Sequence, residues 1–441
     1  MITPVEINSA AEWAADYSNL QQGAFAVGST LYAMVRPITS EHMHMYSSTN
    51  QGLTWTLEDA AGEPSNTTGA ACSYDGANTV WVAWGGPPSE GGLFLYVAAF
   101  DTATNTWGTP FRNELVDVGK MLSVCFRSDG TLFMGYLSPD TSSGLAYSIF
   151  DTIGSIFTAL SVELAPGILT LPEYSANVDI ETMVLAGDAI PATTIYYAYQ
   201  TSDVSAIPQM QNGIFFSTFT AGDAITNFFT VPGQIGTPSQ PSPQAFEAQG
   251  PPFMGPPAVC GAGNVVIPMA QLSAAGGNYA SLYVSTNGGV SWTLDTAAAG
   301  IDPGVTPGAA DSCWTAPGAF WSGSKLYCVY AQLHGGITPA SSIRVTSTTP
   351  DFADPPSTWT WTATTALDYT NIPGMVAGTN GFTFPNYTLA GSEILFGTDV
   401  TGPGNSVEAW FIILSSATAG GRLMGTFVGF VTAGQCSGGV K

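Results

Sequence analysis

The chain has 441 residues, a net charge of −24 and a charged-residue content of only 9%. A chain this acidic repels phosphate, which argues against nucleic acid and against an anionic membrane surface as partners. Apolar residues make up 45% of the sequence, enough to bury a large core, and 51 glycines and 30 prolines favour strands and turns over helices. We therefore expect an all-β protein.

The first residues, Met1 to Glu6, contain neither the basic nor the apolar region of a signal peptide. No apolar run approaches the roughly 18 residues that a membrane helix needs. We therefore expect that the chain does not insert into a membrane. We also expect that it is assembled in the cytoplasm. The six cysteines show no CxxC spacing or short disulfide framework, so we expect buried free thiols. They are Cys72, Cys125, Cys260, Cys313, Cys328 and Cys436.

Residues 8–20 are the best helix candidate. Asn8 or Ser9 could cap its start, and Ser9 and Glu12 have the spacing of a capping box. Trp13 and Tyr17 would then share one face. We predict a short peripheral helix in an N-terminal segment covering residues 1–22.

From residue 23 the sequence repeats a unit of two strands joined by a tight turn, then a loop, then two more strands. The second strands, such as Val80–Trp84, are apolar on both faces, as expected between packed sheets. First strands such as Ala70-Ala71-Cys72 carry small residues that suit a crowded axis. This pattern predicts one β-propeller of about seven four-stranded blades over residues 23–431, with a C-terminal tail over 432–441.

Two turns between third and fourth strands share a signature. It reads Ser48-Thr49-Asn50-Gln51-Gly52-Leu53-Thr54-Trp55 in the first unit and Ser285-Thr286-Asn287-Gly288-Gly289-Val290-Ser291-Trp292 in the fifth. The signature resembles the Asp-box, or BNR repeat, of sialidase-like propellers, with Asn where the family usually has Asp. Asn50 and Asn287 would bond backbone amides, Gly52 and Gly289 would take positive φ, and Trp55 and Trp292 would pack between sheets. Weaker relatives begin at Asp101 and Asp151.

The boxes are structural in that family, so they imply a fold and not a chemistry. A sialidase would also need an arginine triad, a Tyr–Glu pair and an aspartic acid/base. Among the five arginines, only Arg36 faintly echoes the family's arginine motif, and its distance from the box differs. We expect no sialidase activity. A glycosidase acting on a neutral glycan needs only two well-placed carboxylates, and 32 acidic residues are available.

The topology places about half of the 32 acidic residues on the face that carries the longer loops, Glu58, Asp295 and Asp302 among them. They predict either a solvated surface or a cation site, for which Ca²⁺ is the candidate ion and no other cofactor is expected. Asp179 and Glu181 alternate along an inner strand and are predicted to line the channel as binding residues.

Two further features carry hypotheses. His42 and His44 lie two apart on one strand, a spacing that metal ligation could use, although no third ligand is near in sequence. A Pro- and Gln-rich stretch runs from Pro232 to Pro257, and a loop this long is usually functional or disordered. We predict either a partner contact or a cover over the channel there, with Gln240, Gln244 and Phe246 as binding residues.

Two functions follow from these observations. The first is a non-catalytic structural or adhesive propeller of a tailed-phage particle, contacting other virion proteins or a host surface glycan within an oligomeric assembly. It rests on the missing leader, the low charge, the free cysteines and the lack of a catalytic constellation. The alternative is a secreted propeller that binds or hydrolyses a neutral polysaccharide. We expect the protein to bind rather than to catalyse.

Overall fold

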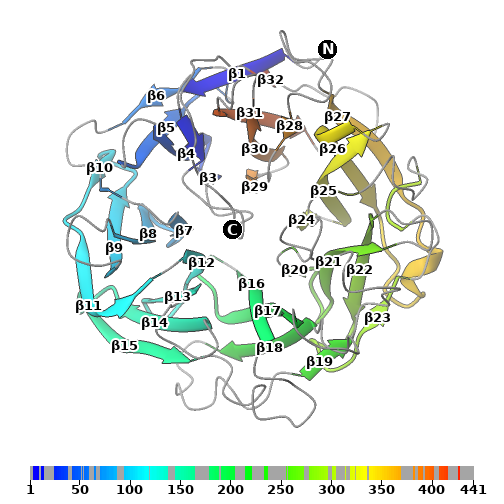
Figure 1. The fold of residues 1–441 in the computed structure, drawn as a ribbon, viewed down its shortest axis with the longest axis horizontal. Coiled ribbons are helices and arrows are strands. Elements are labelled where there is room, and N and C mark those ends of the chain that lie inside the picture. Colours follow the sequence, from blue (N-terminus) through cyan, green and yellow to red (C-terminus); the bar gives the residue numbers. More distant parts are fainter. Residues whose placement is uncertain are drawn as a thin grey trace.

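In the computed structural model, β-strands dominate the chain and form a ring around a central axis (Figure 1). The structure describes residues 3–8, 11–13, 24–37, 42–50, 52, 54–58, 64–65, 70–86, 94–118, 120–137, 145–163, 178–187, 190–203, 214–220, 233–236, 255, 257–272, 278–295, 300–303, 313, 318–322, 324–334, 337–368, 381–382, 386–390, 393–401, 407–415 and 426–427. Within this part of the chain, no helix is long and apolar enough to cross a membrane.

The described strands form seven hydrogen-bonded sheets, most of whose neighbouring strands run antiparallel. Four sheets hold four strands each, from the axis outward (Figure 1). They are β12 (Lys120–Phe126), β13 (Thr131–Leu137), β14 (Leu145–Asp151) and β15 (Ile156–Glu163); β16 (Val178–Gly187), β17 (Thr194–Asp203), β18 (Ile214–Thr220) and β19 (Gly233–Gly236); β20 (Ala258–Val259), β21 (Val265–Leu272), β22 (Asn278–Ser285) and β23 (Thr293–Leu294); and β24 (Gly318–Ser322), β25 (Lys325–His334), β26 (Ile337–Thr348) and β27 (Thr362–Asp368).

In each of the other three sheets one strand position is divided between two segments, and the last of them also has one further strand at its edge. In the first sheet, β2 (Ala11–Trp13) and β3 (Ala24–Val27) both pair with β4 (Thr30–Pro37), followed by β5 (His44–Ser48) and β6 (Thr56–Leu57). In the second, β7 (Ala70–Tyr74), β8 (Thr79–Gly85) and β9 (Phe94–Asp101) are followed by β10 (Thr106–Trp107) and β11 (Phe111–Asp117), which both pair with β9.

The last sheet joins the two ends of the chain. In it, β28 (Gly381–Phe382) and β29 (Asn386–Ala390) pair with β30 (Glu393–Thr401), which pairs with β31 (Val407–Ser415). The N-terminal strand β1 (Thr3–Asn8) then pairs antiparallel with β31, with Val5 opposite Phe411, and parallel with β32 (Thr426–Phe427). The ring is therefore closed by backbone hydrogen bonds between segments from opposite ends of the chain.

The predicted fold class needs correction. Of the residues expected to form a short N-terminal helix, the described ones are Asn8, which ends β1, and 11–13, which form β2; the described residues contain only one short 3-10 helix, at Pro356–Thr358. The expectation of about seven blades with four strands each is also wrong, because the sheets of the described residues contain four, five or six strands. Strand pairing, of β1 with β31 and of β2 with β4, outweighs the weak helical periodicity of the described residues in this segment.

The core lies between neighbouring sheets. Small residues occupy inner strands, as in β7, where Ala70 and Ala71 are fully buried. Large side chains fill the middle strands, where Trp84 stacks on Tyr96 with ring centroids 5.5 Å apart. The described cysteines lie in this interior as free thiols: Cys72, Cys125, Cys260, Cys313 and Cys328. Cys436 falls outside the described residues.

These thiols are expected not to react in the folded protein. Burial raises the pKa of Cys72 and of Cys260 to about 12, so neither forms the reactive thiolate at mildly alkaline pH. A chromogenic thiol reagent should therefore detect none of these five thiols in the native protein, so that at most one thiol, that of Cys436, reacts. After unfolding in denaturant without reductant it should find all of them, and a shortfall of two would reveal a disulfide.

Candidate functional site on the loop-bearing face

The two faces of the ring carry different kinds of connection. One face, here called the turn-bearing face, carries the short turns that join first to second strands and third to fourth strands, such as residues 75–78 and 127–130. The opposite face, the loop-bearing face, carries the second-to-third-strand connections and the links between sheets. Asp302 belongs to the link between β23 and β24.

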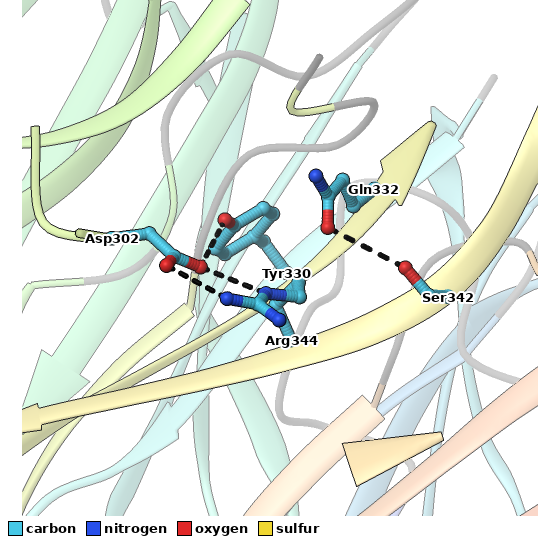
Figure 2. A network of polar contacts seen from close by, with 5 residues as sticks. All are labelled: Asp302, Tyr330, Gln332, Ser342 and Arg344. Carbon is cyan, nitrogen blue, oxygen red and sulfur yellow. Dashed lines mark hydrogen bonds and ion pairs between the residues drawn. The ribbon is translucent and has the colours of Figure 1, made fainter. Parts of the chain in front are cut away.

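A buried ion pair lies beneath this link (Figure 2). The guanidinium of Arg344, on β26, donates two hydrogen bonds to the Asp302 carboxylate: Nε to Oδ2 at 2.9 Å and Nη2 to Oδ1 at 2.8 Å. The hydroxyl of Tyr330, on β25, donates to Asp302 Oδ2 at 2.7 Å. The Asp302 and Arg344 side chains are 3% and 11% exposed, so this bidentate pair lies in a low-dielectric setting.

The electrostatics of this cluster keep the Tyr330 hydroxyl protonated and the Arg344 guanidinium charged. Burial raises the pKa of Tyr330 well above its ordinary value, and the charge of Asp302 raises it further, so the phenol remains a hydrogen-bond donor. Burial alone would lower the pKa of Arg344, but its hydrogen bonds and charge interaction with Asp302 outweigh that effect and raise it. With both carboxylate oxygens bonded, Asp302 is not poised as a general base or nucleophile.

Two more buried polar side chains lie near the end of the β25–β26 hairpin. Ser342 Oγ donates to Gln332 Oε1 at 3.5 Å, and both residues are buried (Figure 2). Cys313 forms an isolated antiparallel bridge with Gln332, which ties a second point of the β23–β24 link to the same sheet. The cluster therefore holds the link between two sheets in a fixed position at the loop-bearing face.

The structure places the other acidic candidates on this face in varied settings. Asp295 is buried, Glu58 accepts a hydrogen bond from Ser47 Oγ, and Glu114 is exposed and paired with Arg112. Sequence reasoning treated Asp295 and Asp302 as parts of a solvated or cation-binding surface, and it missed their burial. No local signal points to it, since the partner of Asp302 lies 42 residues away.

The structure describes two of the five predicted binding residues. Asp179 and Glu181 lie on β16, the strand of its sheet nearest the axis, but the register shifts between Ile180 and Thr182, so Glu181 falls at a bulge. The role of both residues in binding stays a prediction. Gln240, Gln244 and Phe246 lie outside the described residues, as does most of the stretch from Pro232 to Pro257.

The histidine pair is divided between two environments. His42 is exposed and lies 3.4 Å from Ser65 Oγ through Nδ1, whereas His44 is partly buried and stacks on Tyr46. Burial, with the nearby His42, lowers the pKa of His44. Across the described ranges, no three His, Cys, Asp or Glu side chains are grouped to hold a metal ion.

The two box turns form matching hydrogen-bond networks on the turn-bearing face. In one, Asn50 Oδ1 accepts from Thr54 N at 2.9 Å and Asn50 Nδ2 donates to Thr54 Oγ1 at 2.9 Å. In the other, Asn287 Oδ1 accepts from Ser291 N at 2.9 Å and Asn287 Nδ2 donates to Ser291 Oγ at 2.8 Å.

In each turn a glycine N–H also donates a hydrogen bond, and a tryptophan follows at the end of the signature. Gly52 N and Gly289 N each donate to the serine that opens the turn, at 2.8 Å, and both glycines have positive φ. Trp292 packs against the core cluster of β21 and donates from Nε1 to Gly289 O at 2.9 Å. Trp55 is partly buried. The predicted asparagine hydrogen bonds and positive-φ glycines are therefore confirmed in both turns, and the predicted tryptophan packing is confirmed for Trp292.

The weaker relatives form a different turn. Asp101 Oδ1 accepts from Ala103 N at 2.7 Å and Asp151 Oδ1 accepts from Ile153 N at 3.0 Å. The positive φ falls on Asn105 and Ser155 instead of on a glycine. They are aspartate-started hairpin turns and not boxes.

Asn287→Asp is expected to leave stability nearly unchanged, because the Ser291 hydroxyl can reverse and donate to the new carboxylate. Asn287→Ala removes the acceptor of Ser291 N and should cost about 1 kcal/mol. Thermal or urea unfolding of both variants measures the difference. A destabilisation by Asn287→Asp equal to that of Asn287→Ala would contradict the proposed exchange of hydrogen-bond direction.

Comparison with known proteins establishes the fold but not a family. No family model and no curated protein matches the chain. Among solved structures, the polysaccharide lyase Uly1 is similar over 91% of both chains, with a TM-score of 0.54 at 9% identity. A PL25 ulvan lyase is similar over 94% of this chain and 95% of its own, with a TM-score of 0.50 at 8% identity. A phage phi92 endosialidase covers 96% of this chain at a TM-score of 0.46 and 11% identity, with 70% of its own chain covered. The chain therefore has a β-propeller fold.

Proposed function

We propose that this protein is a glycan-acting β-propeller that takes a neutral polysaccharide on its loop-bearing face. The observation that carries the proposal is the similarity of the ring, over more than nine tenths of each chain, to two polysaccharide lyases. This supports the glycan reading better than the purely structural role that the sequence favoured.

The charge of the protein decides which glycan it would accept. A net charge of −24 repels a polymer of uronate or sulfate groups. On the loop-bearing face, the buried guanidinium of Arg344 is already neutralised by Asp302 and therefore offers little compensation. A neutral polymer, bound through hydrogen bonds and apolar contacts, avoids this repulsion.

Purified full-length protein would be tested by affinity electrophoresis in gels that contain arabinan, β-glucan or a polyuronate. We expect retardation by a neutral polymer and none by the polyuronate. Release of reducing ends from a neutral polymer would separate hydrolysis from binding alone, whereas ultraviolet absorbance of an unsaturated uronate, formed only from the polyuronate, would count against the proposal. Migration unchanged in every gel, or retardation only by the polyuronate, would overturn the proposal.

We also infer that the turns at Asn50 and Asn287 are Asp-box turns in which Asn replaces Asp. Support comes from their shared hydrogen-bond network and from the tryptophan at the end of each. The location of the protein on a virus particle and its assembly with other virion proteins stay predictions. Immunogold labelling of intact particles would test both.

A further inference from the structure

Three isoleucines on the turn-bearing face are largely exposed to solvent. Ile153, in the turn between β14 and β15, is 83% exposed, Ile190, before β17, is 67% exposed, and Ile156, at the start of β15, is 58% exposed. Turn positions ordinarily hold Gly, Asn, Asp or Ser. These side chains bury little in the folded chain, so packing does not explain why they are isoleucine.

Ile153 and the segment of Ile190 both lie against one hairpin turn, the turn from Arg127 to Gly130 between β12 and β13, and Ile156 follows Ile153 at the start of β15. A Cβ placed on Gly130 would lie 3.1 Å from Ile153 Cδ1, so the Ile153 side chain covers that glycine. The segment of Ile190 is bonded to the same turn, since Ala192 N donates to Phe126 O at 3.0 Å and Ser128 N donates to Ala192 O at 2.8 Å. We call Ile153, Ile156, Ile190 and Pro191 the isoleucine strip.

The strip rests on three sheets at once. Beyond Ala192, Ile190 O and Pro191 Cδ lie 3.0 and 3.2 Å from a Cβ placed on Gly76, in the turn between β7 and β8. Backbone hydrogen bonds also fix the far end, where Thr152 N donates to Gly130 O at 3.1 Å. Because the turns are bonded to one another, the strip is a preorganised surface and would lose little conformational freedom on binding.

The charges around the strip that reach solvent are carboxylates. Asp75, Asp129 and Asp151 lie in the turns beneath or beside it, and each accepts backbone N–H groups through Oδ1. The nearest described cation, Arg127, is 3% exposed and bonded to Asp129 at 2.8 Å. The solvent-facing surface of these turns therefore combines apolar side chains with carboxylates.

We propose that the isoleucine strip is a docking surface for a segment of a partner protein that carries apolar side chains flanked by Lys or Arg. Exposed apolar side chains gathered at one place favour a protein contact, and the surrounding carboxylates select a cationic partner. A second copy of this chain is disfavoured, since it would bring like charges together. The strip lies on the face opposite the proposed glycan site. If the proposed function holds, the protein can bind the partner protein and a glycan at the same time.

The test uses a fluorescent synthetic peptide of alternating leucine and lysine, and a matched peptide with glutamate for lysine. Fluorescence anisotropy would be measured with the wild type and with the double variant Ile153→Ser/Ile190→Ser. Val290→Ser is the control, because Val290 is 85% exposed in the equivalent turn of another sheet. A charge variant, Asp75→Asn/Asp151→Asn, keeps the Oδ1 acceptors of the turns and removes two charges.

We expect the lysine peptide to bind the wild type and the Val290→Ser variant equally. Binding should weaken about tenfold or more in the isoleucine variant, and by a smaller factor, lost at high salt, in the charge variant. Unchanged melting temperatures would show that the variants fold. Equal binding by the isoleucine variant, equal binding of the glutamate peptide, or no binding of the lysine peptide would overturn the proposal. So would a dimer in sedimentation that the isoleucine variant dissociates.

Discussion

Asp302→Ala is expected to lower the free energy of unfolding by about 3–5 kcal/mol, because it leaves the buried Arg344 guanidinium without its counter-charge. The same change removes the acceptor of the Tyr330 hydroxyl. Equilibrium unfolding in urea, followed by tryptophan fluorescence, would measure the loss.

Two variants make this result specific. Asp302→Leu combined with Arg344→Met removes both charges and should recover most of the lost stability, since apolar residues can replace a buried ion pair at little cost. Glu114→Ala breaks the exposed pair with Arg112 and should not measurably change the unfolding midpoint. A loss below about 1 kcal/mol for Asp302→Ala would show that water reaches the Arg344 guanidinium.

Removal of residues 1–8 is expected to be the most damaging truncation of the described chain. It deletes β1, which pairs with β31 on one side and with β32 on the other. Both edges of this strand carry hydrogen bonds, so its loss opens the ring and exposes the edge of β31. Differential scanning calorimetry and limited proteolysis should show a lower melting temperature and new cleavage around residues 407–415.

A point substitution distinguishes pairing from chain length. Val5→Pro removes a backbone donor opposite Phe411 and should reproduce much of the truncation, whereas Val5→Thr keeps the donor and should be mild. A synthetic peptide of residues 1–13 added to the truncated protein should raise its melting temperature in a concentration-dependent way. Equal stability of the Val5→Pro and Val5→Thr variants would refute the closure role of β1.

Local chemistry in the sequence was enough to place most strands and the box turns. The apolar run Val80–Trp84 lies within β8, and the signature ending at Trp292 forms the turn that its residues predict. The N-terminal strand was missed because its partners lie some 400 residues away, and no periodicity within residues 3–13 reports them. Asp302 was assigned to the surface for a similar reason, since a bidentate partner on another strand leaves no trace in local composition.

Closure by β1 means that the ring can be completed only at the end of protein synthesis. The ribosome releases the first strand early, but its partner β31 emerges only after almost the whole chain has been made. The intervening sheets can pair during synthesis, since most of their strands are neighbours in sequence. Until residues 407–415 arrive, the nascent chain carries two unmatched strand edges, which are sites for mispairing with another copy. Slower translation would prolong that interval. The yield of folded protein should therefore depend on the rate at which the last codons of the mRNA are translated.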